Sequence, residues 1–179
     1  MPAYHSSFNE EPDMRLAGNM AILPIKTKLR GPAPNADPDT PDIIDETLDL
    51  FRANSLFRNF EIKGPADRTL IVLILYISDC LAKIGSNRTV PTQIEAGKFL
   101  NTLSVDNFAI PGDANFALNA HYAPPSSRQE ADALRQYLVQ VRQELASRLV
   151  ERLYADGTGK PSKWWMSFQK RRFMNRSLA

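Results

Sequence analysis

The sequence predicts an all-α fold in which an apolar helix over about residues 66–84 is surrounded by other helices. Three observations predict it. Residues 70–77 would be apolar on every side of a helix, so that helix must be covered all round. A long amphipathic segment begins near residue 128. Residues 1–40 are rich in Pro, Gly, Asn and Asp, which predicts an extended arm. At 179 residues, we expect a single domain, 1–179.

The N-terminal arm contains one short apolar run, residues 20–25, within otherwise polar and turn-forming sequence. Pro24 lacks a backbone N–H, so this run is predicted to be an edge strand or an extended segment. Residues 31–38 contain Pro32, Pro34 and Pro38 and cannot be helical. We expect the whole arm to lie on the helical body.

A first helix is predicted over about residues 41–54. Thr40 is the expected N-cap, and Pro41 would occupy the first helical position. The acidic residues that follow suit the positive end of a helix: Asp42, Asp45 and Glu46. Apolar residues then recur at roughly helical spacing: Ile44, Leu48, Phe51 and Leu56. Whether the helix continues through Phe60 is left open.

The most apolar stretch of the chain, residues 66–84, is predicted to be a helix between Pro65 and Gly85. A buried strand is the rival interpretation for residues 70–77, because several of them are β-branched. The length of the stretch favours the helix. The run is also shorter than the 18 or so apolar residues that a membrane-spanning helix needs.

A shorter helix is predicted over residues 92–104, with an apolar face made of Ile94, Phe99, Leu100 and Leu103. Residues 107–125 form a loop longer than a simple connection requires. Because this loop carries five large apolar or aromatic residues, we expect it to be packed onto the body. They are Phe108, Ile110, Phe116, Leu118 and Tyr122.

The longest helix is predicted over about residues 128–155, opened by a capping box of Ser127 and Glu130. Its apolar stripe consists of Leu134, Leu138, Val141 and Leu145, and then moves around the helix to Leu149, Val150, Leu153 and Tyr154. Arg148 and Arg152 occupy the original line. Either the helix end curves over a different part of its own core, or its last turns bind a partner.

The chain shows no sign of an active site. It has two histidines, His5 and His121, and a single cysteine, Cys80, too few for a typical metal site. Residues 157–160 lack the glycine and Ser/Thr positions of a phosphate-binding loop. We therefore expect no enzymatic activity, no cofactor and no metal. The lone cysteine and the absence of a signal-peptide pattern predict a cytosolic location.

The C-terminal segment combines aromatic and basic residues. Residues 160–179 carry six Lys and Arg and no acidic residue, whereas the remainder of the chain has a balance of −4. Ser162 is expected to cap a final helix over residues 163–174. We predict that this helix binds a partner through Lys163, Trp164, Trp165, Phe168, Lys170, Arg171 and Arg172.

This predicted helix has large apolar residues on two separate faces. Trp164 lies on one face, whereas Met166 and Phe173 lie roughly opposite. One face would contact the body and part of the other a partner; alternatively, the N-terminal arm or the long loop covers the second face. A protein with an acidic surface suits the segment better than a membrane does. A cytosolic RNA-binding role is the alternative.

Several short segments, read in order, resemble one family. They are residues 1–7, 18–25, 31–34, 66–71 and 107–112, followed by Lys-Pro-Ser-Lys-Trp-Trp at 160–165 and Phe-Met-Asn at 173–175. Together they resemble the 21 kDa subunit family, subunit 3, of the actin-related protein 2/3 complex. The resemblance runs essentially from end to end, and the mass of 20.1 kDa agrees with it.

The resemblance implies a helix surrounded by other helices and a non-catalytic structural subunit of an actin nucleator. It implies protein partners: the other subunits, especially actin-related protein 3, and the actin filament. It implies no nucleic acid, no membrane insertion and no cofactor, since ATP belongs to the actin-related subunits. The implied location is the cytoplasm and the cortical actin cytoskeleton. No individual contact residue follows from the resemblance.

Overall fold

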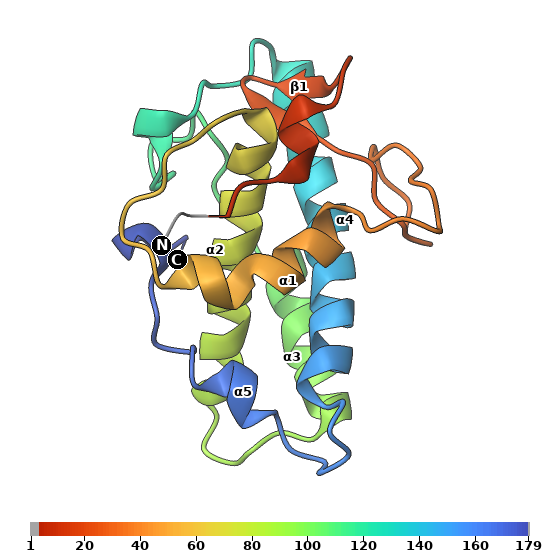
Figure 1. Ribbon diagram of the computed structural model, residues 1–179, viewed down its shortest axis with the longest axis vertical. Coiled ribbons are helices and arrows are strands. Elements are labelled where there is room, and N and C mark those ends of the chain that lie inside the picture. Colours follow the sequence, from red (N-terminus) through yellow and green to blue (C-terminus); the bar gives the residue numbers. More distant parts are fainter. Residues whose placement is uncertain (1–3, 179) are drawn as a thin grey trace.

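The computed structural model describes residues 4–178 and is mostly helical, with one small sheet (Figure 1). The α-helices are α1 (Ile43–Ser55), α2 (Pro65–Gly85), α3 (Gln93–Val105), α4 (Arg128–Leu153) and α5 (Lys163–Met166). Three short 3₁₀ helices, η1 (Ser7–Glu10), η2 (Asn119–His121) and η3 (Phe173–Asn175), and two strands, β1 (Arg15–Ala17) and β2 (Met20–Ile22), complete it. The fold is therefore not strictly all-α, because part of the arm forms a hairpin.

Helix α2 carries the most apolar stretch of the chain. Residues 70–77 are helical and buried, so the strand interpretation was wrong. The helix contacts α1, α3, α4 and β2, as well as the shorter η1 and α5. In Figure 1, α2 and α4 run along the long axis and α1 crosses them. Neighbours on several sides therefore keep its apolar side chains from water.

The arm forms an antiparallel hairpin, in which Ala17 pairs with Met20 around a two-residue turn. Gly18, in this turn, has φ of 59°, a conformation that glycine adopts without strain. A Cβ atom at this position would lie 2.3 Å from the Ala123 carbonyl oxygen. Glycine therefore lets the turn dock against residues 123–124, where Asn19 Oδ1 accepts a 2.8 Å hydrogen bond from the Ala123 N–H.

Strand β2 stops at Ile22, just before Pro24. The run was expected to be an edge strand or extended, and residues 20–22 are indeed a strand. The backbone of Leu23 is satisfied by one side chain on α4: its N–H donates to the Tyr137 hydroxyl at 2.9 Å, and that hydroxyl donates to its carbonyl at 3.0 Å. The Tyr137 hydroxyl therefore supplies the hydrogen bonds that a paired strand would otherwise give to the Leu23 backbone, next to Pro24.

Helix α1 begins two residues later than expected. Asp42, not Thr40, is its N-cap, and its carboxylate accepts from the Asp45 N–H at 2.9 Å. The Asp45 carboxylate in turn accepts from the Asp42 N–H, which completes a capping box. Arg148 also binds both carboxylates. A capping box reinforced from α4 outweighs the local Thr-Pro signal. The helix ends at Ser55 and does not continue through Phe60.

Helix α3 occurs where expected, but its apolar face differs. Leu100 is buried, whereas Ile94 is 73% exposed and was wrongly assigned to the core. The loop over residues 107–125 is packed down, as predicted, with Ile110, Phe116, Leu118 and Tyr122 buried. The Tyr122 hydroxyl donates a 2.6 Å hydrogen bond to the Arg68 carbonyl, which ties the loop to α2.

Only half of the expected capping box forms on α4. The Ser127 hydroxyl accepts from the Glu130 N–H at 3.1 Å, as predicted. The Glu130 carboxylate instead accepts hydrogen bonds from the Gly18 N–H and the Ser126 hydroxyl. The glutamate therefore holds the hairpin turn of the arm against the start of α4.

The apolar residues at the end of α4, where the apolar stripe moves around the helix, belong to the core of this chain. Leu149, Val150, Leu153 and Tyr154 are all buried within it. On the original line, Arg148 pairs with Asp42 at 2.8 Å and Arg152 pairs with Asp49 at 2.9 Å, both from α1. The helix end thus curves over its own core, and these apolar residues are not free to bind a partner.

Candidate partner-binding surface

The C-terminal segment is not the continuous helix expected over residues 163–174. Helix α5 is a single turn, and η3 includes Met174 and Asn175 at φ of 54° and 56°. Ser162 caps α5 as predicted, accepting from the Trp164 N–H at 3.2 Å. A short helix is marginal in water, so packing of the aromatic side chains on the body decides the path of this segment.

Two of the predicted residues anchor the segment rather than face outward. Trp165 is buried and stacks on Phe51 of α1, with ring centroids 5.8 Å apart. Phe168 is also buried and meets Phe51 edge-on at 6.3 Å. Both side chains remove a large apolar area from water, which fixes the segment to α1.

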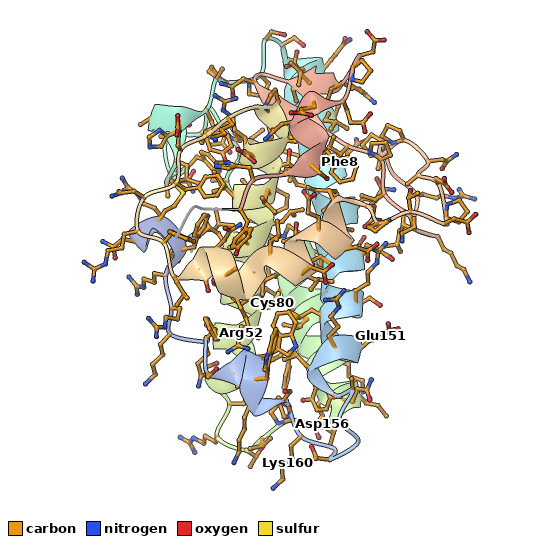
Figure 2. All side chains as sticks on the ribbon, viewed as in Figure 1. Phe8, Arg52, Cys80, Glu151, Asp156 and Lys160 are labelled. Carbon is orange, nitrogen blue, oxygen red and sulfur yellow. The ribbon has the colours of Figure 1, made fainter. Side chains whose placement is uncertain are left out.

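Trp164 is the exposed aromatic residue of the segment, with 52% of its surface accessible. The guanidinium carbon of Arg52, on α1, lies 3.9 Å from its ring centroid and 4.5 Å from that of Phe168. Arg52 extends from α1 near α5 (Figure 2). Cation–π contact with Arg52 and an edge contact with Trp165 at 5.0 Å hold the indole ring in place.

The four predicted basic residues, Lys163, Lys170, Arg171 and Arg172, are exposed. Arg171 lies 5.9 Å from the Phe168 ring. Within residues 4–178, none of the four forms an ion pair with an acidic side chain. Trp164 therefore projects from a positively charged surface, which suits an acidic partner.

Phe173, predicted to lie on the second apolar face, is covered by this chain, whereas Met166 from the same face is only half-buried. Phe173 is buried against Phe60, at a centroid distance of 5.5 Å, and the Met174 N–H donates to the Phe57 carbonyl at 3.0 Å. The cover comes from the connection between α1 and α2. The two alternatives left open for this face were cover by the arm or the long loop and contact with a partner; the arm lies close by, since the ring of its His5 is 4.7 Å from that of Phe60, in a tilted arrangement.

Sequence reasoning missed Arg52, which orders Trp164. Arg52 follows Phe51 in an amphipathic helix, and basic residues in such helices commonly face solvent without any specific contact. Its pairing with residues more than a hundred positions away has no local signal. The only signal in the sequence was the cluster of aromatic residues near the C-terminus, since aromatic rings are common stacking partners of arginine.

The single cysteine, Cys80, is buried in the core in an unreactive form. Burial raises the pKa of the Cys80 thiol to about 12, so it stays protonated at neutral pH. Among residues 4–178, no three His, Cys, Asp or Glu side chains are grouped so as to hold a metal ion. In the same part of the chain, no helix is both long and apolar enough to cross a membrane.

Comparison with known proteins gives one consistent result. Residues 1–178 match the family described as the ARP2/3 complex ARPC3 (21 kDa) subunit. Actin-related protein 2/3 complex subunit 3 of Schizosaccharomyces pombe is 57% identical, over 99% of this chain and all of its own length. The protein of the same name in Saccharomyces cerevisiae is 52% identical, over 99% of this chain and 100% of its own length. The one in Dictyostelium discoideum is 49% identical, over 98% of this chain and 99% of its own length. The chain belongs to the ARPC3 (21 kDa) subunit family.

Proposed function

We propose that this chain is a non-catalytic structural subunit of the actin-related protein 2/3 complex. It contributes to the nucleation of branched actin filaments through protein–protein contacts, chiefly with actin-related protein 3 and also with the actin filament. It acts in the cytoplasm, at the cortical actin cytoskeleton. The observation that carries this proposal is the match to subunit 3 proteins over nearly the full length of both chains. Those relatives give no support to the RNA-binding alternative.

The fold suits a structural role. Helix α2 contacts elements from η1 near the N-terminus to α5 near the C-terminus, and its apolar side chains are buried. Closely packed interiors of this kind deform little. Interfaces between rigid surfaces lose less conformational entropy on binding. The chain needs no cofactor or active site of its own for such a role.

The C-terminal segment supplies one of the contacts. Trp164, Lys163, Lys170, Arg171 and Arg172 face outward and bind an acidic surface of a partner subunit, whereas Trp165 and Phe168 hold the segment on α1. Tryptophan and arginine are the residue types that most often dominate interface energies.

Two single substitutions separate these roles. A tagged chain is co-expressed with the other subunits of the complex and recovered by affinity purification. Trp164→Ala should keep its melting temperature within a few degrees and recover less of actin-related protein 3. Trp165→Ala should instead lower the free energy of unfolding by about 3 kcal/mol or more, because it removes a buried aromatic side chain.

The proposal as a whole is tested by the wild-type chain. It should co-purify with actin-related protein 3 in equal amounts, and a salt-titrated assay should detect no tight RNA binding. Recovery of RNA without the other subunits would favour the rival role. A folded Trp164→Ala chain that assembles normally would remove Trp164 from the interface, while leaving membership of the complex intact.

A further inference from the structure

An open groove of about 720 Å³ lies beside α5. It is formed where the end of α2, the connection from α2 to α3 and the connection from α4 to α5 come together, at one end of the long axis (Figure 1). The apolar side chains in its lining are Ile84, Val90, Pro91, Pro161, Trp164 and Met166. The groove thus adjoins the indole ring that Arg52 holds in place.

Two large apolar side chains in the lining of the groove are exposed. Val90 is 62% exposed and Trp164 is 52% exposed, and both contribute to its lining. Of the other lining residues, Ile84 is buried and Met166 is half-buried. Exposed apolar side chains that line one groove can accept an apolar side chain of a partner, and pockets of this kind often hold the residues that dominate an interface.

The charged residues around the groove are predominantly basic. Lys160 and Lys163 line it, and Lys83 and Arg88 are exposed on the adjoining segment, which has no acidic residue between them. Asp156 is the one acidic residue among those that line the groove. Its carboxylate already accepts hydrogen bonds from the Thr158 N–H at 3.1 Å and the Thr158 hydroxyl at 2.8 Å.

We propose that this groove binds an acidic segment of a neighbouring subunit that inserts one large apolar side chain between Val90 and Trp164. This inference rests on the proposed function, since it takes the partner from the same complex. The apolar side chain displaces water from the groove, and flanking carboxylates face Lys160 and Lys163. Apolar contact supplies most of the affinity, and the opposite charges favour an acidic segment over others.

Photo-crosslinking in the assembled complex tests the occupant directly. Val90 is replaced by p-benzoyl-phenylalanine, the complex is purified and irradiated, and crosslinked peptides are identified by mass spectrometry. We expect a crosslink to another subunit, within a segment of net negative charge. If the complex assembles but Val90 crosslinks to no other subunit, or to a basic segment, the groove proposal is overturned.

Substitutions measure how much the groove contributes. Val90→Asp, and separately Lys160→Glu with Lys163→Glu, should each lower incorporation about tenfold in competition with the wild-type chain. The loss from the lysine reversals should shrink at high salt. Matched controls are Val105→Asp, another exposed apolar site, and Lys98→Glu, both on α3 and outside the groove lining.

Different results would contradict the proposed function and the proposed groove contact. A wild-type chain that does not assemble with the other subunits would sink the proposed function and the groove together. If the wild-type chain assembles, and the groove variants melt normally and compete as well as wild type, only the groove proposal is overturned. Because Val90, Lys160 and Lys163 are exposed, these substitutions should not prevent folding.

Discussion

Single arginines hold aromatic side chains in place at two points of this molecule. Arg142 is buried with its guanidinium carbon 4.5 Å from the Tyr76 ring and 4.3 Å from the Phe108 ring, and it donates to the Leu103 carbonyl at 2.8 Å. Burial lowers its pKa. Arg52 plays the equivalent part beneath Trp164. A guanidinium suits both places because it is weakly hydrated and stacks on rings.

Replacing Arg52 with alanine should loosen the C-terminal segment without unfolding the protein. Each cation–π contact contributes about 0.5–2 kcal/mol, so the free energy of unfolding should fall by about 1–3 kcal/mol. Both tryptophans of the chain lie in this segment, so fluorescence reports on it directly. We expect a red-shifted emission in Arg52→Ala. The matched control is Arg58→Ala, at an exposed site; equal effects in the two variants would contradict the stacking role.

Asp79 on α2 gives a pH-dependent prediction. Burial raises the pKa of its carboxyl to about 6, although the charge of Arg142 opposes this. Below about pH 4 the group is protonated in both the folded and the unfolded chain. Between about pH 4 and 6 the folded chain holds the proton more tightly, so the contribution of Asp79 to stability falls as pH rises. Asp79→Asn should therefore stabilise the protein at pH 7 by about 1–3 kcal/mol.

Urea unfolding at pH 4 and pH 7 measures this effect. The gain in Asp79→Asn over wild type should appear at pH 7 and largely vanish at pH 4. Asp132→Asn, at an exposed site on α4, is the control and should change stability little at either pH. A variant that gains nothing at pH 7 would show that the folded protein does not penalise the Asp79 carboxylate.

At the scale of elements, the start of α1 is fixed by contacts from elsewhere in the chain. Arg148 on α4 binds Asp42 and Asp45 at 2.8 and 3.0 Å, and it also donates to the Lys26 carbonyl of the arm. Although burial alone would raise the pKa of Asp45, its hydrogen bonds with Lys26 and Asp42 and the charge of Arg148 hold that pKa below its usual value. Three segments therefore meet at one helix end.

The position of the α1 cap can be tested with two alanine substitutions. Asp42→Ala removes the cap and leaves Arg148 without its buried partner, so it should cost about 2–4 kcal/mol. Thr40→Ala, at an exposed residue whose hydroxyl makes only a 3.5 Å contact with the Asp37 carbonyl, should cost about 0.5 kcal/mol or less. Thermal and chemical unfolding compare them. A larger loss from Thr40→Ala would place the cap where the sequence suggested.

At the scale of the whole molecule, side-chain hydrogen bonds fasten the arm to the body. The buried carboxylate of Asp67, on α2, accepts from the Ser6 N–H at 2.8 Å and lies 2.7 Å from His5 Nδ1. The Asn54 side chain exchanges two hydrogen bonds with the Tyr4 backbone, at 2.9 and 2.8 Å. The arm thereby joins α1 and α2 over their polar ends as well as packing on the core.

Removing the Asp67 carboxylate should release the start of the arm. Hydrogen bonds to a charged group contribute about 1.5–3 kcal/mol each, so Asp67→Ala should speed amide exchange in residues 4–9 by about tenfold or more. Hydrogen–deuterium exchange with peptide-level mass spectrometry measures this. Asp49→Ala, at an exposed site, is the control. Unchanged exchange in a folded Asp67→Ala chain would mean that other contacts suffice to hold the arm.

Elements with strong local signals could be predicted from the sequence, and those decided by distant contacts could not. Ser127 and Ser162 cap their helices as expected, because capping involves only neighbouring residues. Ile94 fits the helical period of α3 but points to solvent, since the period does not say which neighbours cover a face. The two apolar faces predicted for a helix over residues 163–174 do not form as one helix would place them, because that segment is not one helix.

The sequence by itself determined that about residues 66–84 form a helix, observed as Pro65–Gly85, and that residues 70–77 are buried, because an unbroken apolar run leaves no face for water. It also placed the aromatic and basic residues together at the C-terminal end. Only the tertiary structure decided which of them face outward: Trp165 meets Phe51, and Trp164 is held by Arg52 at the surface. Such contacts join residues over a hundred positions apart, and their geometry exists only once the helices have packed.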